Sequence, residues 1–276
     1  MLPHQQPSNT AMQLHSARPE SKLRAMVFAP LDIVAFIWFC VCWMGYSLFA
    51  RHAARRRNSL SSVLYRYRKE WIRKLALSGM SEVDAELLAS LERQVSFLAS
   101  TSLLILASLV TVLSTASDMF LNINTLDFVD EVPLEVVQLK LLLMIFIFIY
   151  GFFTFTWSIR QYGFCFIIFG SSFNTVKYYK EAPGYKPTLA NRDFNAMAKV
   201  LDRAAHSYNF GIRAYYFAMA VLGWFINSWF FMVACAVTVL VLYRREFKSV
   251  SLKALVNARL VNNVHDEPEI TYNPDD

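Results

Sequence analysis

Polar side chains recur on one face of a helix that the sequence predicts upstream of, and into, its last apolar segment. At 3.6 residues per turn their directions fall within about 40° of one another; the residues are Asn195, Asp202, His206, Asn209, Arg213 and Asn227. A charge inside an apolar segment costs about 2.5 to 3.5 kcal/mol on insertion scales, so it seeks a partner or a water-filled cavity. The spacing therefore predicts one polar stripe that continues into the apolar segment.

A second polar pair, Arg160 and Gln161, interrupts an apolar run that extends from Leu134 to Phe173. As one helix this run is about 60 Å long, roughly twice the hydrocarbon thickness of a bilayer, so Arg160 need not lie at mid-membrane. A span that begins near Leu134 places the guanidinium at the membrane surface, where long cationic side chains reach the headgroups. We expect the remainder to project as a cytoplasmic helix rather than bend back at Gly163.

The arginines of these two features are predicted to lie at one depth, near the inner headgroups. With Arg160 and Arg213 we expect the basic end of the first apolar segment, at Arg51 and Arg55. Guanidinium groups bind phosphate and carboxylate groups through paired hydrogen bonds. Converging arginines thus predict an anion site, with two alternatives open: non-specific anchors that orient the chain, and a stripe whose cytosolic half is a solvated helix face.

Signals for catalysis are absent or weak. The sequence contains no HExxH, Walker P-loop, GxSxG or GxGxxG motif. Asp202 and His206, one turn apart, resemble an acid–base pair, but a solvated ion pair is the favoured interpretation. The 4 cysteines lie in apolar segments without a CxxC pattern, which favours helix packing. We therefore expect no metal and no cofactor, and an enzyme is the less favoured class.

The composition identifies the elements that must position these residues. Of the 276 residues, 55% are hydrophobic and 17% are charged, which is typical of a polytopic membrane protein. The segments long enough to cross a bilayer lie at about 31–50, 97–116, 134–157 and 212–243. The expected fold is all-α: a four-span helical bundle within residues 26–255, with long cytoplasmic helical extensions. A disordered extension at 1–25 and an acidic disordered tail at 256–276 are expected to flank it.

The distribution of charge predicts the orientation. Arginine and lysine gather between the first two spans, whereas the loop 117–135 carries acidic residues and no lysine or arginine. By the positive-inside rule the first loop is cytoplasmic and the second lies outside. The adjoining membrane accounts for the basic charge, so nucleic-acid binding is not supported. A four-span count leaves both termini outside, which conflicts with the basic start of the tail at Arg244, Arg245 and Lys248.

Three further patterns concern the extensions and the spans. An amphipathic helix is predicted at about 60–77, lying either in the headgroup region of an anionic leaflet or packed on its neighbours. A single helix of roughly 50 Å is predicted at about 82–116. Its hydroxyl residues Thr101, Ser108, Thr111 and Thr115 share one face, which favours close helix packing over a polar conduction path.

Several segments in order resemble a known family. They are "PLDIVAFIWF" (30–39), "FTWSIRQYGFC" (155–165), "RAYYFAMAVLGWF" (213–225) and "VLYRREFKS" (241–249). Together they look like the integral membrane proteins catalogued as domain of unknown function number five-nine-nine, found in bacteria and plants. The resemblance covers about residues 26–255 and implies a four-span membrane protein. It brings no activity and no functional residues.

The favoured hypothesis is a non-enzymatic protein of the bacterial inner membrane that binds an anionic lipid headgroup or a small anionic solute at its cytoplasmic side. Membrane lipids, most of all anionic ones, are the expected partners, together with a possible second copy of the chain. The alternatives are an oligomeric channel or transporter component, in which Asn227 and the hydroxyl face line a polar path, and a membrane scaffold that recruits cytoplasmic partners.

Overall fold

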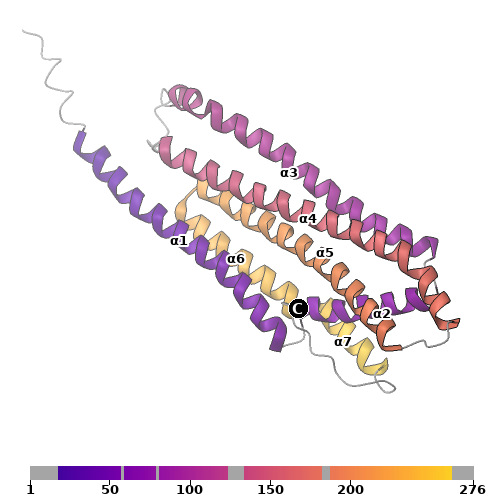
Figure 1. Ribbon diagram of the computed structural model, residues 1–276. Helices are drawn as coiled ribbons and strands as arrows, with labels where there is room; N and C mark the ends of the chain where they lie inside the picture. Colours follow the sequence, from indigo (N-terminus) through magenta and orange to yellow (C-terminus); the bar gives the residue numbers. More distant parts are fainter. Residues whose placement is uncertain (1–17, 57–58, 79–80, 124–133, 182–186, 263–276) are drawn as a thin grey trace, which may run out of the picture.

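The computed structural model describes residues 18–56, 59–78, 81–123, 134–181 and 187–262, and within these ranges it contains helices and no strand (Figure 1). The all-α prediction is confirmed. The helices are α1 (Arg18–Arg56), α2 (Leu60–Ser78), α3 (Glu82–Ile123), α4 (Leu134–Glu181), α5 (Pro187–Leu222), the short 3-10 helix η1 (Gly223–Phe225), α6 (Ser228–Phe247) and α7 (Val250–Asn262).

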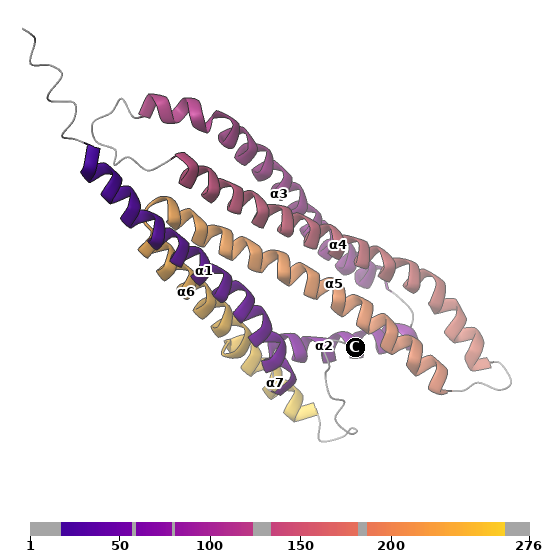
Figure 2. The same ribbon diagram turned by 60° about the vertical axis from the view of Figure 1, so that its left-hand side comes forward.

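The long helices run side by side along one axis, and α2 lies across one end of them (Figures 1 and 2). Helix α4 packs against α3 on one side and α5 on the other, and α6 joins α5 to α1. Helix α7 lies beside α2. We call the end that carries α2 the α2 end, and the opposite end, where the chain turns through η1, the η1 end.

Two clusters of buried side chains hold the bundle together. The first combines residues of α1, α4, α5 and α6 and begins at η1, where Trp224 stacks on Phe231 of α6 at 4.8 Å between ring centroids. Near the α2 end, α2, α3, α4 and α5 share a second core. There Gly211 of α5 faces the ring of Phe155 so closely that a Cβ atom would overlap the ring. The glycine therefore sets the close approach of α4 and α5.

By length and composition, the helices at Pro30–Ala50, Glu82–Ala116 and Leu134–Gly170 are the 3 in the described ranges that qualify as membrane-crossing. They indicate a membrane protein. They also correspond to the first three predicted spans, so the expected four-span count is not confirmed.

The prediction of one helical span at 212–243 is wrong, because the chain reverses within it. Helix α5 ends at Leu222, and the amides of Ile226 and Asn227 both donate to the Gly223 carbonyl, at 3.2 and 3.1 Å. Asn227 is extended, and its side-chain oxygen accepts from the Trp229 amide at 2.9 Å. Asn227 is thus the N-cap of α6, not a buried member of the stripe on α5.

This reversal determines where the basic start of the tail lies in the bundle. Because α6 runs back along α1, its basic residues Arg244 and Arg245 lie at the α2 end, beside the basic helix α2 (Figure 2). The Ser61 amide at the start of α2 donates to the Glu246 carboxylate at 3.1 Å. The positively charged segments therefore gather at one end of the bundle.

The predicted extensions form, and the helices extend beyond their predicted limits. Helices α3 and α4 are each continuous, and α4 does not bend back at Gly163. The apolar face of α2 is buried, with Ile72 and Leu75 in the core that it shares with α5, so α2 packs on its neighbours. Residues 18–25 and 256–262 are helical rather than disordered. Residues 1–17 and 263–276 lie outside the described ranges.

Candidate functional site

Helix α5 carries four of the predicted site residues on one face at the α2 end. Asp202 lies at one limit of this face, where its Oδ1 accepts from Arg68 Nη1 of α2 at 2.6 Å. Arg213 lies at the other limit, with its guanidinium carbon 5.3 Å from the ring centre of Tyr46 in α1. His206 and Asn209 occupy the turns between them. The contacts of Asp202 and Arg213 show that this face is directed toward α2 and the end of α1.

Asp202 is the most enclosed member of this face, at 6% exposure. His206 Nδ1 lies 3.3 Å from Asp202 Oδ2, so the predicted pairing forms; Arg68 closes over the carboxylate, whereas the imidazole stays partly exposed. Burial raises the pKa of nearby Tyr65, and the negative charge of Asp202 adds to that rise. A buried carboxylate repels an anion, so Asp202 serves to join α2 to α5.

Gln161 and Arg160, neighbours in the sequence, have different surroundings. Gln161 is buried, and its Oε1 accepts from Ser207 Oγ of α5 at 3.1 Å. One turn earlier, Ser158 donates to the Ala204 carbonyl at 2.7 Å. Arg160 is exposed and lies over Phe164 of its own helix, at 5.9 Å. The two polar residues therefore do not act together.

Arg213 is half-buried, and two aromatic rings lie close to its guanidinium. Its guanidinium lies 5.3 Å from Tyr46 and 5.4 Å from Phe210. Within the described part of the chain, no carboxylate lies within ion-pair distance of it. Cation–π contacts of this kind restrict a guanidinium while leaving its N–H donors to a ligand. This is the geometry expected of a group that binds an anion.

The remaining predicted positions do not join this site. Asn195 is exposed near the start of α5, two turns before Asp202, and Asn227 caps α6 at the η1 end. The structure does not bring Arg160 to Arg213, because each lies on rings of different helices. The side chains of Arg51 and Arg55 lie outside the described part of the molecule.

A polar cluster at the η1 end was missed by the sequence analysis. Asp32 of α1 accepts from Trp224 Nε1 at 2.7 Å and from the Ser228 hydroxyl. Lys140 of α4, at 8% exposure, donates to the Trp224 carbonyl at 3.0 Å. The cluster fixes the reversal between α5 and α6 against α1 and α4. The sequence offered one signal for this cluster: Asp32 and Lys140 have opposite charges, and each lies near the start of an apolar segment.

The hydroxyl face of α3 lies mostly on the outside of the bundle. Thr111 and Ser108 are exposed, and each donates to a backbone carbonyl one turn earlier in its own helix, at 3.0 and 3.1 Å. Helix α3 packs chiefly on α4. A polar path along this face therefore requires a second copy of the chain. In the described residues no group of three His, Cys, Asp or Glu side chains could hold a metal ion.

Comparison with known proteins identifies one family. The family described as "Protein of unknown function, DUF599" matches residues 34–251. That range begins within α1 and ends at the start of α7, so it includes Arg213 and the reversal at η1. No curated protein and no solved structure shows significant similarity to the chain.

Proposed function

We propose that this chain, which belongs to the DUF599 family, binds an anionic lipid headgroup or a small anionic solute at the α2 end of its bundle. Arg213 carries the contact, and Asn209, one turn earlier on α5, extends it. The observation on which the proposal depends is the half-buried guanidinium of Arg213, which lies near two aromatic rings and has no carboxylate partner within the described residues.

The charge of the surrounding surface supports an anionic ligand. Exposed basic residues from three helices gather at the α2 end: Arg73 and Lys74 of α2, Lys199 and Arg203 of α5, and Arg244 and Arg245 of α6. A field of one sign raises the local concentration of ligands of the opposite sign. Arg245 lies over the ring of Tyr216 and donates to its hydroxyl, so part of this charge is held in place.

The proposed location follows from the same distribution of charge. We place the α2 end in the cytoplasm and the η1 end outside, in the inner membrane of a bacterium, with α1, α3, α4, α5 and α6 all passing through the bilayer. In this orientation Arg213 lies near the inner headgroups. The phosphate groups of anionic lipids lie at that depth.

Native mass spectrometry of gently purified protein tests the proposal. The wild type is expected to retain a discrete anionic species, and Arg213→Ala is expected to lose it. Removing a charge-assisted hydrogen-bond donor costs about 1.5 to 3 kcal/mol, so the affinity falls by roughly tenfold or more. Arg213→Lys keeps the charge without the paired donors and should retain the species weakly.

Arg160→Ala is the matched control, because Arg160 is an exposed arginine on a neighbouring helix. It should retain the species at the level of the wild type. Equal retention by wild type and Arg213→Ala would show that Arg213 is only an anchor for orientation.

A further inference from the structure

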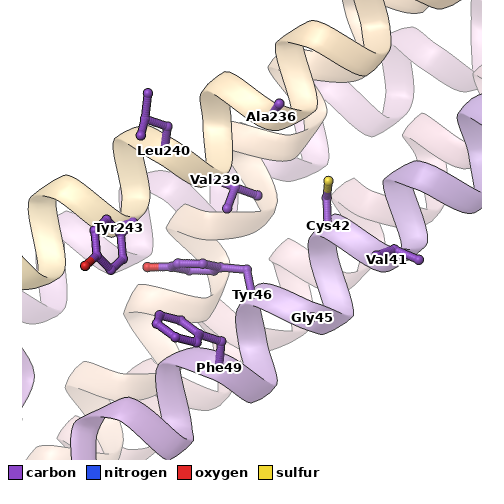
Figure 3. A pocket seen from close by; sticks show the side chains of 9 residues that line it. All are labelled: Val41, Cys42, Gly45, Tyr46, Phe49, Ala236, Val239, Leu240 and Tyr243. Carbon is purple, nitrogen blue, oxygen red and sulfur yellow. The ribbon is translucent and has the colours of Figure 1, made fainter.

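An open groove of about 430 Å³ lies between α1 and α6 (Figure 3). Its volume falls within the range of small-molecule sites in proteins. Apolar side chains line most of it, among them Val41 of α1 and Leu240 of α6. From Val41 to Phe49 the groove follows α1 for about 12 Å, at 1.5 Å per residue.

The groove runs toward the α2 end, where three aromatic side chains line it: Tyr46 and Phe49 of α1 and Tyr243 of α6 (Figure 3). The rings of Phe49 and Tyr243 lie 6.0 Å apart between centroids. The other end of the groove, at Val41 and Ala236, lies farther from α2 along the apolar segments of both helices. In the proposed orientation the groove therefore extends from the headgroup depth into the hydrocarbon of the same leaflet.

Each of these tyrosines carries a cation on its ring. The Arg213 guanidinium lies 5.3 Å from the centre of Tyr46, and Lys248 Nζ lies 5.8 Å from the centre of Tyr243. Cations bind the faces of aromatic rings by electrostatic attraction. The residues that line the groove carry no charge themselves, so the positive charge near it is that of Arg213 and Lys248, which lie on the two tyrosine rings.

We propose that this groove holds an acyl chain of an anionic phospholipid whose phosphate is bound at Arg213. The inference rests on the proposed function and names the class of ligand. A phospholipid is favoured over a small solute, because a small polar solute would leave the apolar groove empty. The occupant fits the charge and the polarity of the groove: an anion at the cationic end and hydrocarbon along Val41, Cys42 and Val239.

Gly45 offers a way to fill the groove without disturbing the helices. It lines the groove, and a Cβ atom built on it meets no atom within 4 Å. Leucine favours a helix more than glycine does, so Gly45→Leu should fold and place its side chain in the groove. Gly163→Leu is the matched control, since Gly163 also has open space around it but lies on α4.

The test uses wild type, Gly45→Leu, Gly163→Leu and Arg213→Ala, each reconstituted in phosphatidylcholine with a minor share of phosphatidylglycerol. Native mass spectrometry then counts the lipids that remain after transfer to mild detergent. Wild type and Gly163→Leu should retain phosphatidylglycerol in preference to phosphatidylcholine. Gly45→Leu and Arg213→Ala should retain at least about tenfold less. Soluble glycerol phosphate, added to each variant, reports headgroup binding separately.

The outcomes separate the groove from the headgroup site. Retention of phosphatidylglycerol by Gly45→Leu together with its loss from Arg213→Ala would overturn the groove and leave the proposed function intact. Binding of glycerol phosphate without any retained phospholipid would do the same. Equal retention by Arg213→Ala and wild type would overturn both. A wild-type dimer that becomes a monomer in Gly45→Leu would show that a second copy occupies the groove, and would also overturn the inference.

Discussion

Asp202 and Arg68 join α5 to α2 through a carboxylate that has little contact with water. Arg68→Ala removes the partner and leaves the charge of Asp202 buried, which is the costly way to break such a pair. We expect the free energy of unfolding to fall by about 2 kcal/mol, measured as a lower thermal unfolding temperature in detergent.

The control for this pair is Arg73→Ala, which removes an exposed arginine from the same helix and should change stability by less than about 0.5 kcal/mol. The double variant Arg68→Ala/Asp202→Asn should recover part of the loss, because no buried charge then remains uncompensated. If Arg68→Ala and Arg73→Ala unfold at the same temperature, the pair does not stabilise the packing of α2 on α5.

At the residue scale, helical periodicity correctly placed Asp202, His206, Asn209 and Arg213 on one face of α5. It could not reveal that Arg68 would neutralise Asp202, because the partner comes from another helix and leaves no local pattern. Arg160 and Arg213 were given the same role, since both are arginines beside apolar sequence. The rings of Tyr46 and Phe210 distinguish Arg213 from Arg160. The ring of Tyr46 comes from α1, so its contact with Arg213 depends on how the helices pack.

The packing of α4 on α5 depends on Gly211. Gly211→Ala forces a methyl group into the ring of Phe155, and overpacking of this kind costs about 1 to 3 kcal/mol. We expect a lower unfolding temperature and reduced yield of folded protein. Gly163→Ala on α4 meets open space and should be neutral or slightly stabilising, because alanine favours the helix. Equal stability of the two variants would contradict the close approach at Gly211.

At the element scale, hydropathy found α1, α3 and α4 because each is a long apolar helix, but it could not find the reversal between α5 and α6. The residues of the turn, from Gly223 to Asn227, are themselves mostly apolar. Hydropathy averaged over the length of a span therefore stays high across the turn and does not reveal it. The local signals were Gly223, which permits close return of Phe230, and Asn227 before Ser228, which is typical of a helix start.

For the whole molecule, the reversal predicts that the turn and the start of α7 lie on opposite sides of the membrane. In a cysteine-free background, Ile226→Cys and Val250→Cys introduce thiols at positions that are 77% and 83% exposed. A membrane-impermeant thiol reagent should label Ile226→Cys in intact cells and Val250→Cys only after the membrane is disrupted. Labelling of both positions from one side would contradict the arrangement, and a single span at 212–243 would protect Ile226→Cys in both conditions.

At the sequence level the charge of the basic tail conflicted with an even number of crossings. The reversal considered there was at Gly163, whereas the structure has it between α5 and α6. The two clusters of buried residues could not be predicted from the sequence, because they combine side chains from helices that are far apart along the chain. The groove between α1 and α6 likewise arises from the return of α6 along α1.

The most direct test of the account is the distance between the phosphorus of phosphatidylglycerol and the guanidinium of Arg213, measured by solid-state NMR in bilayers with isotopically labelled arginine. We predict an arginine signal that phosphorus dephases strongly, present in wild type and Arg160→Ala and absent in Arg213→Ala. An unchanged set of dephased arginine signals in Arg213→Ala would contradict the claim that this residue binds an anionic headgroup.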